Sequence, residues 1–154
     1  MRFMWIGAVL ALGALACGEK KSEQPPAGEA PAQAAAQPEP TGQVIEVKMT
    51  GSGNTFQYEP AAFSVEEGVG ITVRFINVSG GPHNVAFWAD SIPAGAAAGL
   101  NTAMPNRMDN LAGPFLINPN DHYDIKFDGL PEGVYKGFCT PHLALGMKFT
   151  LTLK

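Results

Sequence analysis

Cysteine is scarce in this chain of 154 residues, which holds only Cys17 and Cys139. Because Cys17 falls in an N-terminal apolar stretch, no disulfide is expected within the rest of the chain. Basic residues are also few, since 10 Lys and Arg stand against 14 Asp and Glu, for a net charge of −4. Phosphate binding needs clustered Lys and Arg, so nucleic acid is excluded as a partner. The length suits one globular domain.

No apolar run is long enough to span a bilayer comfortably. Residues 3–16 are apolar, follow Arg2 and end at Cys17, which is typical of an export signal. The stretch Ala16-Cys17-Gly18 looks like a bacterial lipoprotein cleavage site, although Ala14 occupies the place where Leu is usual. We therefore expect residues 1–17 to be a signal peptide and Cys17 to carry a lipid. A plain secretory signal is the alternative, and either signal places the protein in the periplasm or at the cell surface.

Residues 18–40 contain neither aromatic nor β-branched side chains. Such a segment cannot bury enough surface to fold, so it is predicted to be a disordered Ala- and Pro-rich tether. Its prolines favour extended conformations that would hold the domain away from an anchor at Cys17. Without lipidation, a solvated tail with no role is the alternative. The folded domain is expected over residues 41–154.

Apolar residues in the domain recur at every second position, which is the period of half-buried strands. The alternation covers residues 45–49, 71–75, 123–127 and 149–153, with shorter strands at 85–87 and 134–139. Turn-forming residues separate these runs. The pattern predicts an all-β fold, either a sandwich or a barrel. Residues 93–111 lack the alternation and are expected to form a long loop with one short helix.

The segment from Cys139 to Met147 places a thiol, the imidazole of His142 and a thioether on one short loop between two predicted strands. All three are soft or borderline metal ligands. A free thiol is a liability in an oxidising compartment unless a metal ion occupies it. His83 follows a Gly-Gly-Pro turn far upstream and would approach this loop across the fold. A His₂Cys plane with a weak axial Met is the arrangement of type 1, or blue, copper electron-transfer sites.

The sequence Cys139-Thr140-Pro141-His142, followed four residues later by Gly146-Met147, resembles the ligand loop of the cupredoxins, in particular plastocyanin and pseudoazurin. Pro82-His83-Asn84-Val85 resembles the other ligand strand of that family, and residues 91–95 are similar to the segment that follows it. The resemblance covers residues 44–153 and implies a cupredoxin-type Greek-key β-sandwich. Residues 93–114 depart from a plastocyanin in length and in their Met and Asn content, so the subfamily stays open.

The resemblance implies roles for individual residues. His83, Cys139 and His142 would be equatorial copper ligands and Met147 the axial one. Asn84 would tie the His83 strand to the backbone beside Cys139 or Thr140. An apolar patch around the outer edge of His142 would receive redox partners, and its members are Pro141, Leu143, Ala144 and Leu145.

Taken singly, these residues have ordinary structural explanations, and it is their joint order and spacing that favours one copper ion. His122 is interpreted as a surface residue in the turn at 118–121, and Met104 and Met108 as loop packing. A copper oxidase or reductase would need further histidines. The sequence is also compatible with a copper carrier or storage protein, whereas a cupredoxin-like module without metal conflicts with the four intact ligands. We expect a protein that is not an enzyme and that shuttles single electrons between a donor and an acceptor, such as a cytochrome, oxidase or reductase.

Overall fold

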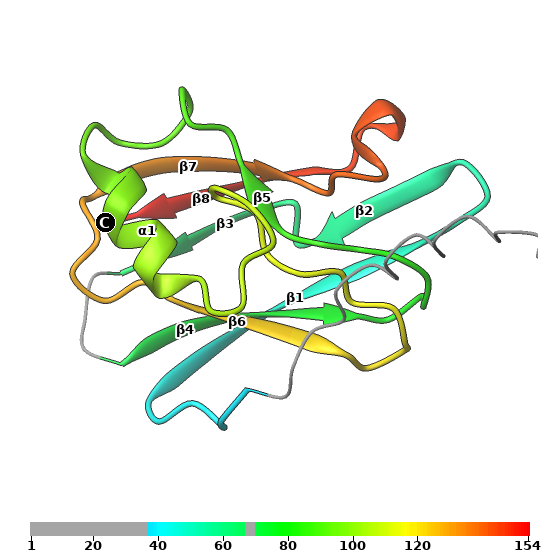
Figure 1. Cartoon of the computed structure of the whole chain (residues 1–154), viewed down its shortest axis with the longest axis horizontal. Helices are drawn as coiled ribbons and strands as arrows, with labels where there is room; N and C mark the ends of the chain where they lie inside the picture. The colour runs from blue at the N-terminus through cyan, green and yellow to red at the C-terminus, as the bar shows by residue number, and fades with distance from the viewer. Residues whose placement is uncertain (1–36, 67–69) are drawn as a thin grey trace, which may run out of the picture.

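The computed structural model describes residues 37–66 and 70–154. The predicted signal peptide, Cys17 and residues 18–36 of the predicted tether lie outside the described residues. Within the described part, eight strands accompany one α-helix and one 3₁₀ turn (Figure 1). Their bounds are β1 (Gln43–Ser52), β2 (Thr55–Glu59), β3 (Ala62–Val65), β4 (Ile71–Asn77), β5 (Ala86–Phe87), α1 (Ala96–Ala103), β6 (His122–Lys126), β7 (Gly133–Phe138), η1 (Leu143–Leu145) and β8 (Lys148–Leu153).

The strands form two four-stranded sheets, ordered β2-β1-β4-β6 and β3-β8-β7-β5. The pairs β1·β4 and β3·β8 are parallel, and the other neighbours are antiparallel. The sheets lie one above the other (Figure 1), and the buried core is formed by residues of both. Because side chains alternate across a strand, register decides which residues share the core. Val47 pairs with Phe75, and Phe75 with Tyr123, and all three are buried. The predicted all-β fold is confirmed, and of the two arrangements that the sequence allowed it is the sandwich.

The predicted strands correspond to β1, β4, β5, β6, β7 and β8, whereas β2 and β3 were not predicted. β2 follows β1 through a two-residue turn, since Ser52 pairs with Thr55. Gly53 begins that turn at a φ of 60°, which glycine adopts without steric cost. The hairpin extends to the right-hand end of the molecule in Figure 1, beside η1.

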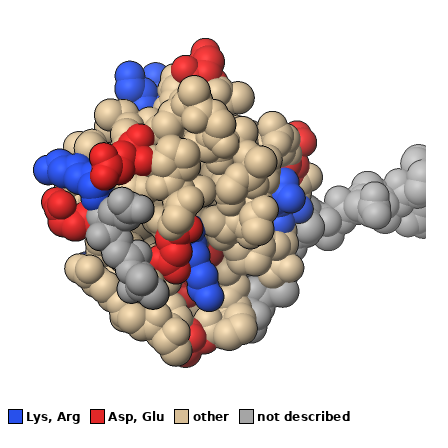
Figure 2. Space-filling model, turned by 90° about the vertical axis from the view of Figure 1, so that its left-hand side faces the viewer, with Lys and Arg blue, Asp and Glu red and all other residues tan. Residues whose placement is uncertain are grey.

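The predicted helix in residues 93–111 is α1. It buries Ala96 and Leu100 against the core. Met104, which ends the helix, is also buried, whereas Met108 is exposed. The helix lies at the end of the sandwich opposite η1, together with the C-terminus (Figure 1). Acidic and basic side chains are interspersed on that end of the molecule (Figure 2).

Gln37 and Glu39, which were predicted to belong to the tether, contact β6 and the neighbouring β4. The side-chain amide of Gln37 donates to the Asp124 carbonyl at 3.0 Å and accepts from the Asp124 N–H at 2.6 Å. Glu39 pairs with Arg74 at 2.8 Å. β6 is the outer strand of its sheet, so the two hydrogen bonds of Gln37 satisfy backbone groups that an edge strand would otherwise expose.

His122 is not in the preceding turn, as its sequence context suggested, but is the first residue of β6. It is half-buried, and its Nε2 is buried without a hydrogen-bond partner. Within residues 37–66 and 70–154, we find no helix with the length and apolar character that crossing a membrane requires.

Candidate metal centre

Three of the predicted ligands lie on the connection between β7 and β8. These strands are antiparallel neighbours whose last pair is Phe138 with Lys148, so the connection must return on itself. The Cys139 N–H donates to the Met147 carbonyl at 3.1 Å, and the Met147 N–H donates to the His142 carbonyl at 3.2 Å. Gly146 completes the turn at a φ of 84°. The short loop therefore brings the thiol, imidazole and thioether residues together.

His83 reaches the same end of the sandwich from the chain that precedes β5. It pairs with Leu116 through two backbone hydrogen bonds, of 3.0 and 2.7 Å. Ala86 pairs with Phe138, so antiparallel register continues from there toward Asn84 and Thr140. The upstream ligand is thus carried to Cys139 by strand pairing, although 56 residues separate them.

The donor atoms have the spacing that one metal ion needs. Cys139 Sγ lies 3.7 Å from His83 Nδ1 and 3.4 Å from His142 Nδ1, and the three donors all fall within 4.8 Å of one another. Metal bonds of about 2.3 Å to sulfur and about 2.0 Å to nitrogen, spread in a trigonal plane, separate such donors by about 3.7 Å. A thiolate, two imidazoles and a thioether, which Met147 offers from the same loop, form the donor set of a blue-copper site.

Burial shifts the pKa values of the candidate ligands and so sets their protonation states. His83, Cys139 and Met147 are fully buried, and His142 is half-buried. Burial, helped by the neighbouring His142, lowers the pKa of His83 to about 4, and burial also lowers the pKa of His142. Both imidazoles are therefore neutral and able to bind metal near pH 7. Burial raises the pKa of Cys139, opposed in part by backbone hydrogen bonds from Asn84 and His142. Metal binding must therefore displace the thiol proton.

Asn84 joins the two ligand-bearing segments. Its Oδ1 accepts from the Thr140 N–H at 2.7 Å, and its Nδ2 donates to Thr140 Oγ1 at 3.1 Å. A longer contact of 3.4 Å connects Nδ2 to the Gly113 carbonyl. Asn84 is fully buried, so these bonds satisfy an amide that would otherwise be costly to bury.

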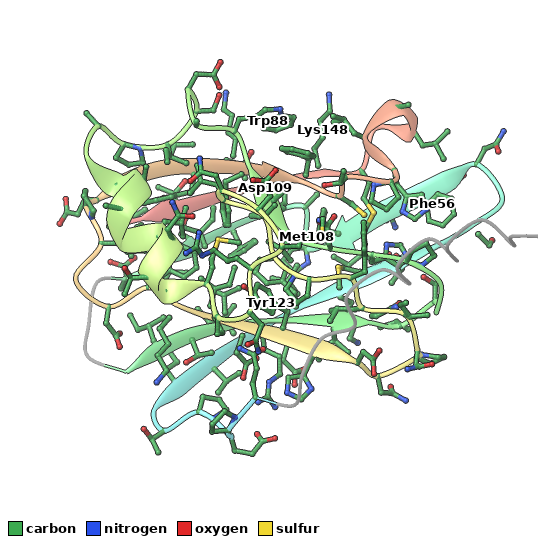
Figure 3. The ribbon with its side chains drawn as sticks, in the orientation of Figure 1. Phe56, Trp88, Met108, Asp109, Tyr123 and Lys148 are labelled. Carbon is green, nitrogen blue, oxygen red and sulfur yellow. The ribbon has the colours of Figure 1, made fainter. Side chains whose placement is uncertain are left out.

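Two side chains that the sequence did not point to contact the histidine ligands. Ser79 Oγ lies 3.0 Å from His83 Nε2. When Nδ1 binds a metal ion, Nε2 carries the ring proton and can donate a hydrogen bond to this hydroxyl. Phe56 of β2 stacks on His142, with ring centroids 3.8 Å apart and planes inclined by 8°; Figure 3 shows it beside η1. Neither contact has a signal in the sequence, because each depends on how distant segments pack.

Comparison with known proteins agrees with this centre. Residues 45–154 match the family described as copper binding proteins, plastocyanin/azurin family. The chain belongs to this family. Plastocyanin of Scenedesmus fuscus is 33% identical over 110 residues, which are 71% of this chain and 99% of that protein.

Two solved structures are similar in fold. A mutant plastocyanin of fern has 28% identity and a TM-score of 0.54 over 71% of this chain and all of that one. Auracyanin of the photosynthetic bacterium Roseiflexus castenholzii has 28% identity and a TM-score of 0.50 over 72% and 96%. The predicted cupredoxin fold is confirmed.

The predicted cofactor is confirmed as well. The chain is a type 1 copper protein of the plastocyanin/azurin family, with its site formed by His83, Cys139, His142 and Met147. It is an electron carrier, not an enzyme, and as such exchanges electrons with redox partners.

Proposed function

We propose that this copper protein is exported and carries single electrons between redox proteins of the cell envelope, through an apolar patch around His142. The observation that carries the proposal is the uneven exposure of the ligands. His83, Cys139 and Met147 are fully buried, whereas His142 is half-buried. The imidazole of His142 is thus the ligand through which the site reaches the surface.

The residues around the site serve to keep its geometry the same in both oxidation states. When bound, copper supplies a one-electron Cu(II)/Cu(I) couple. Ser79 holds the outer nitrogen of His83, and Phe56 lies flat against His142. Asn84 keeps the loop of Cys139 against the upstream strand. Side chains held in this way move little, which lowers the reorganisation that accompanies an electron's arrival or departure.

The patch consists of Pro141, Leu143, Ala144 and Leu145. Leu143 is half-buried and the others are exposed, Leu145 by 43%. η1 holds three of them on one turn at the right-hand end of the molecule in Figure 1. An exposed apolar surface beside a partly exposed ligand suits the brief docking of a redox protein, because apolar contacts exclude water without requiring one fixed partner.

Electron self-exchange between oxidised and reduced copies tests the patch without a known partner. Leu145→Asp should slow self-exchange about tenfold or more, since two patches would then meet with like charges. Val134→Asp is the matched control, because Val134 is also 43% exposed but lies on β7 away from η1. Equal rates for the two variants, at unchanged reduction potential, would exclude the patch as the route.

The location at the membrane is supported by the apolar run that ends at Cys17 and by the Pro-rich segment that follows it. Cys17→Ser should leave the precursor unprocessed or shift the protein out of the detergent-soluble membrane fraction. Unchanged fractionation would leave a plain secretory signal as the explanation and would remove the lipid anchor from the proposal.

A further inference from the structure

One buried backbone carbonyl beside His83, that of Asn84, receives no hydrogen bond from strand pairing. The carbonyls of His83 and Val85 both accept hydrogen bonds from the segment at 113–116, at 2.7 and 2.8 Å. Successive carbonyls of an extended chain point in opposite directions. The Asn84 carbonyl between them therefore points away from that segment. Asn84 is fully buried, so its carbonyl needs a donor from elsewhere.

Continuing the register of β5 and β7 would bring Thr140 opposite Asn84, but Thr140 cannot supply that donor. Its N–H donates to the side chain of Asn84, at 2.7 Å. The ligand loop departs from the strand at this point, since the Cys139 carbonyl already turns to the His142 N–H. The hydrogen-bonded pairing that extends from β5 and β7 therefore ends before it reaches the Asn84 carbonyl.

Tyr58 of β2 supplies the missing donor. Its hydroxyl donates to the Asn84 carbonyl at 2.7 Å, in a buried position. The ring is 1% exposed and packs edge-on against Phe75 and Phe149, with centroids 6.0 and 4.8 Å away. Burial, reinforced by the nearby Cys139, raises the pKa of Tyr58 well above 10, so the hydroxyl is protonated and able to donate near neutral pH.

We propose that Tyr58 is a positioning residue of the copper centre, which holds the His83–Asn84 backbone from the core side by its hydrogen bond to the Asn84 carbonyl. Packing alone does not explain a tyrosine here, because a phenylalanine would fill the same space without burying a hydroxyl. This role depends on the copper centre but not on the redox partners or on the envelope location. It would therefore hold even if the proposed partners or location were wrong.

The hydrogen bond from Tyr58 affects the position of His83 because Asn84 is the next residue along the chain. Oδ1 and Nδ2 of Asn84 are committed to Thr140, so any shift of the Asn84 backbone moves both the His83 side of the site and the loop that carries Cys139. Tyr58 therefore fixes the distance between the two ligands that come from different parts of the chain.

The test compares Tyr58→Phe with Tyr135→Phe in the full chain. Tyr135 is the control, since its side chain is also buried and its hydroxyl donates to a backbone carbonyl, that of Pro131, at 2.6 Å in a part-buried position. Pro131 lies in the β6–β7 connection, which carries none of the ligands. Each variant removes one oxygen atom and one hydrogen bond. Both should lower the stability of the metal-free protein, and Tyr58→Phe should lower it more, because it leaves a buried carbonyl without a donor.

Only Tyr58→Phe should change the site itself. Copper loss to a chelator should accelerate about 2- to 10-fold, the equivalent of one net hydrogen bond, and the thiolate-to-copper absorption band should shift. In the metal-free protein, the Thr140 amide, which donates to Asn84, should exchange with solvent faster by a similar factor. If the two variants show the same copper loss, the same absorption and the same Thr140 exchange, Tyr58 has only a packing role and the proposal is wrong.

Discussion

Asn84 offers the sharpest test of how the two ligand segments are held together. Replacing it with Ala removes both hydrogen bonds to Thr140, which measure 2.7 and 3.1 Å. Each is worth about 0.5–1.5 kcal/mol net, so together they contribute roughly 1–3 kcal/mol. The Gly113 carbonyl also loses its 3.4 Å contact, and truncating a fully buried side chain leaves a cavity. We therefore expect Asn84→Ala to destabilise the metal-free protein by about 2–4 kcal/mol.

Urea unfolding of the metal-free protein, followed by circular dichroism, measures this loss directly. A cycle with Thr140→Val isolates the bond from Nδ2 to the Thr140 hydroxyl, because Val keeps the shape and the backbone N–H while removing the oxygen. The coupling energy should be about 0.5–1.5 kcal/mol. A loss below about 0.5 kcal/mol for Asn84→Ala would mean that the loop holds its shape without Asn84. A coupling energy near zero would show that the 3.1 Å contact contributes nothing.

Two further predictions concern the axial ligand and alkaline pH. Met147→Leu should raise the reduction potential, because it would remove a weak donor that favours Cu(II), and Met147→Gln should lower it, because its oxygen would be a harder donor that favours Cu(II) more strongly; equal potentials in voltammetry would mean that Met147 is not the axial ligand. Burial raises the pKa of Tyr135 to about 12 and that of Tyr123 further, whereas an unfolded tyrosine titrates near 10. The folded state therefore favours the protonated phenols. Their contribution to the free energy of unfolding is complete below pH 10 and is lost as pH rises through about 12. Urea midpoints should fall over that interval, and less steeply in Tyr135→Phe; a midpoint independent of pH would contradict the argument.

The chemistry of the site follows from the order of residues along the chain. Cys139, His142 and Met147 lie within one loop of nine residues, so their convergence needs only a tight turn between strands. Their thiol, imidazole and thioether are also a combination of side chains that few functions other than metal binding require together. His83 was found through the motif around it, because a metal site needs a further imidazole and the Pro-His-Asn sequence resembles that of a known family.

Alternation along the chain likewise predicts the longer strands, since one buried face imposes a period of two. The same pattern did not identify β2 and β3, although Phe56 and Tyr58 alternate with polar neighbours. These strands are only five and four residues long, and Pro60 interrupts the segment between them. Each holds only two alternating apolar residues, Phe56 and Tyr58 in one and Phe63 and Val65 in the other, against three in each of the longer predicted runs, so the pattern carries little weight without a partner strand.

The side chains that support the ligands are recognisable only in the folded molecule. Phe56 stacks on His142, Ser79 bonds His83, and Tyr58 bonds the carbonyl of Asn84. Two of these residues lie on β2, which the sequence did not identify as a strand. Their roles depend on the direction in which a hairpin folds back across the sandwich and on which backbone carbonyl is left without a strand neighbour. Those are properties of contacts between distant segments, and no local pattern of residues encodes them.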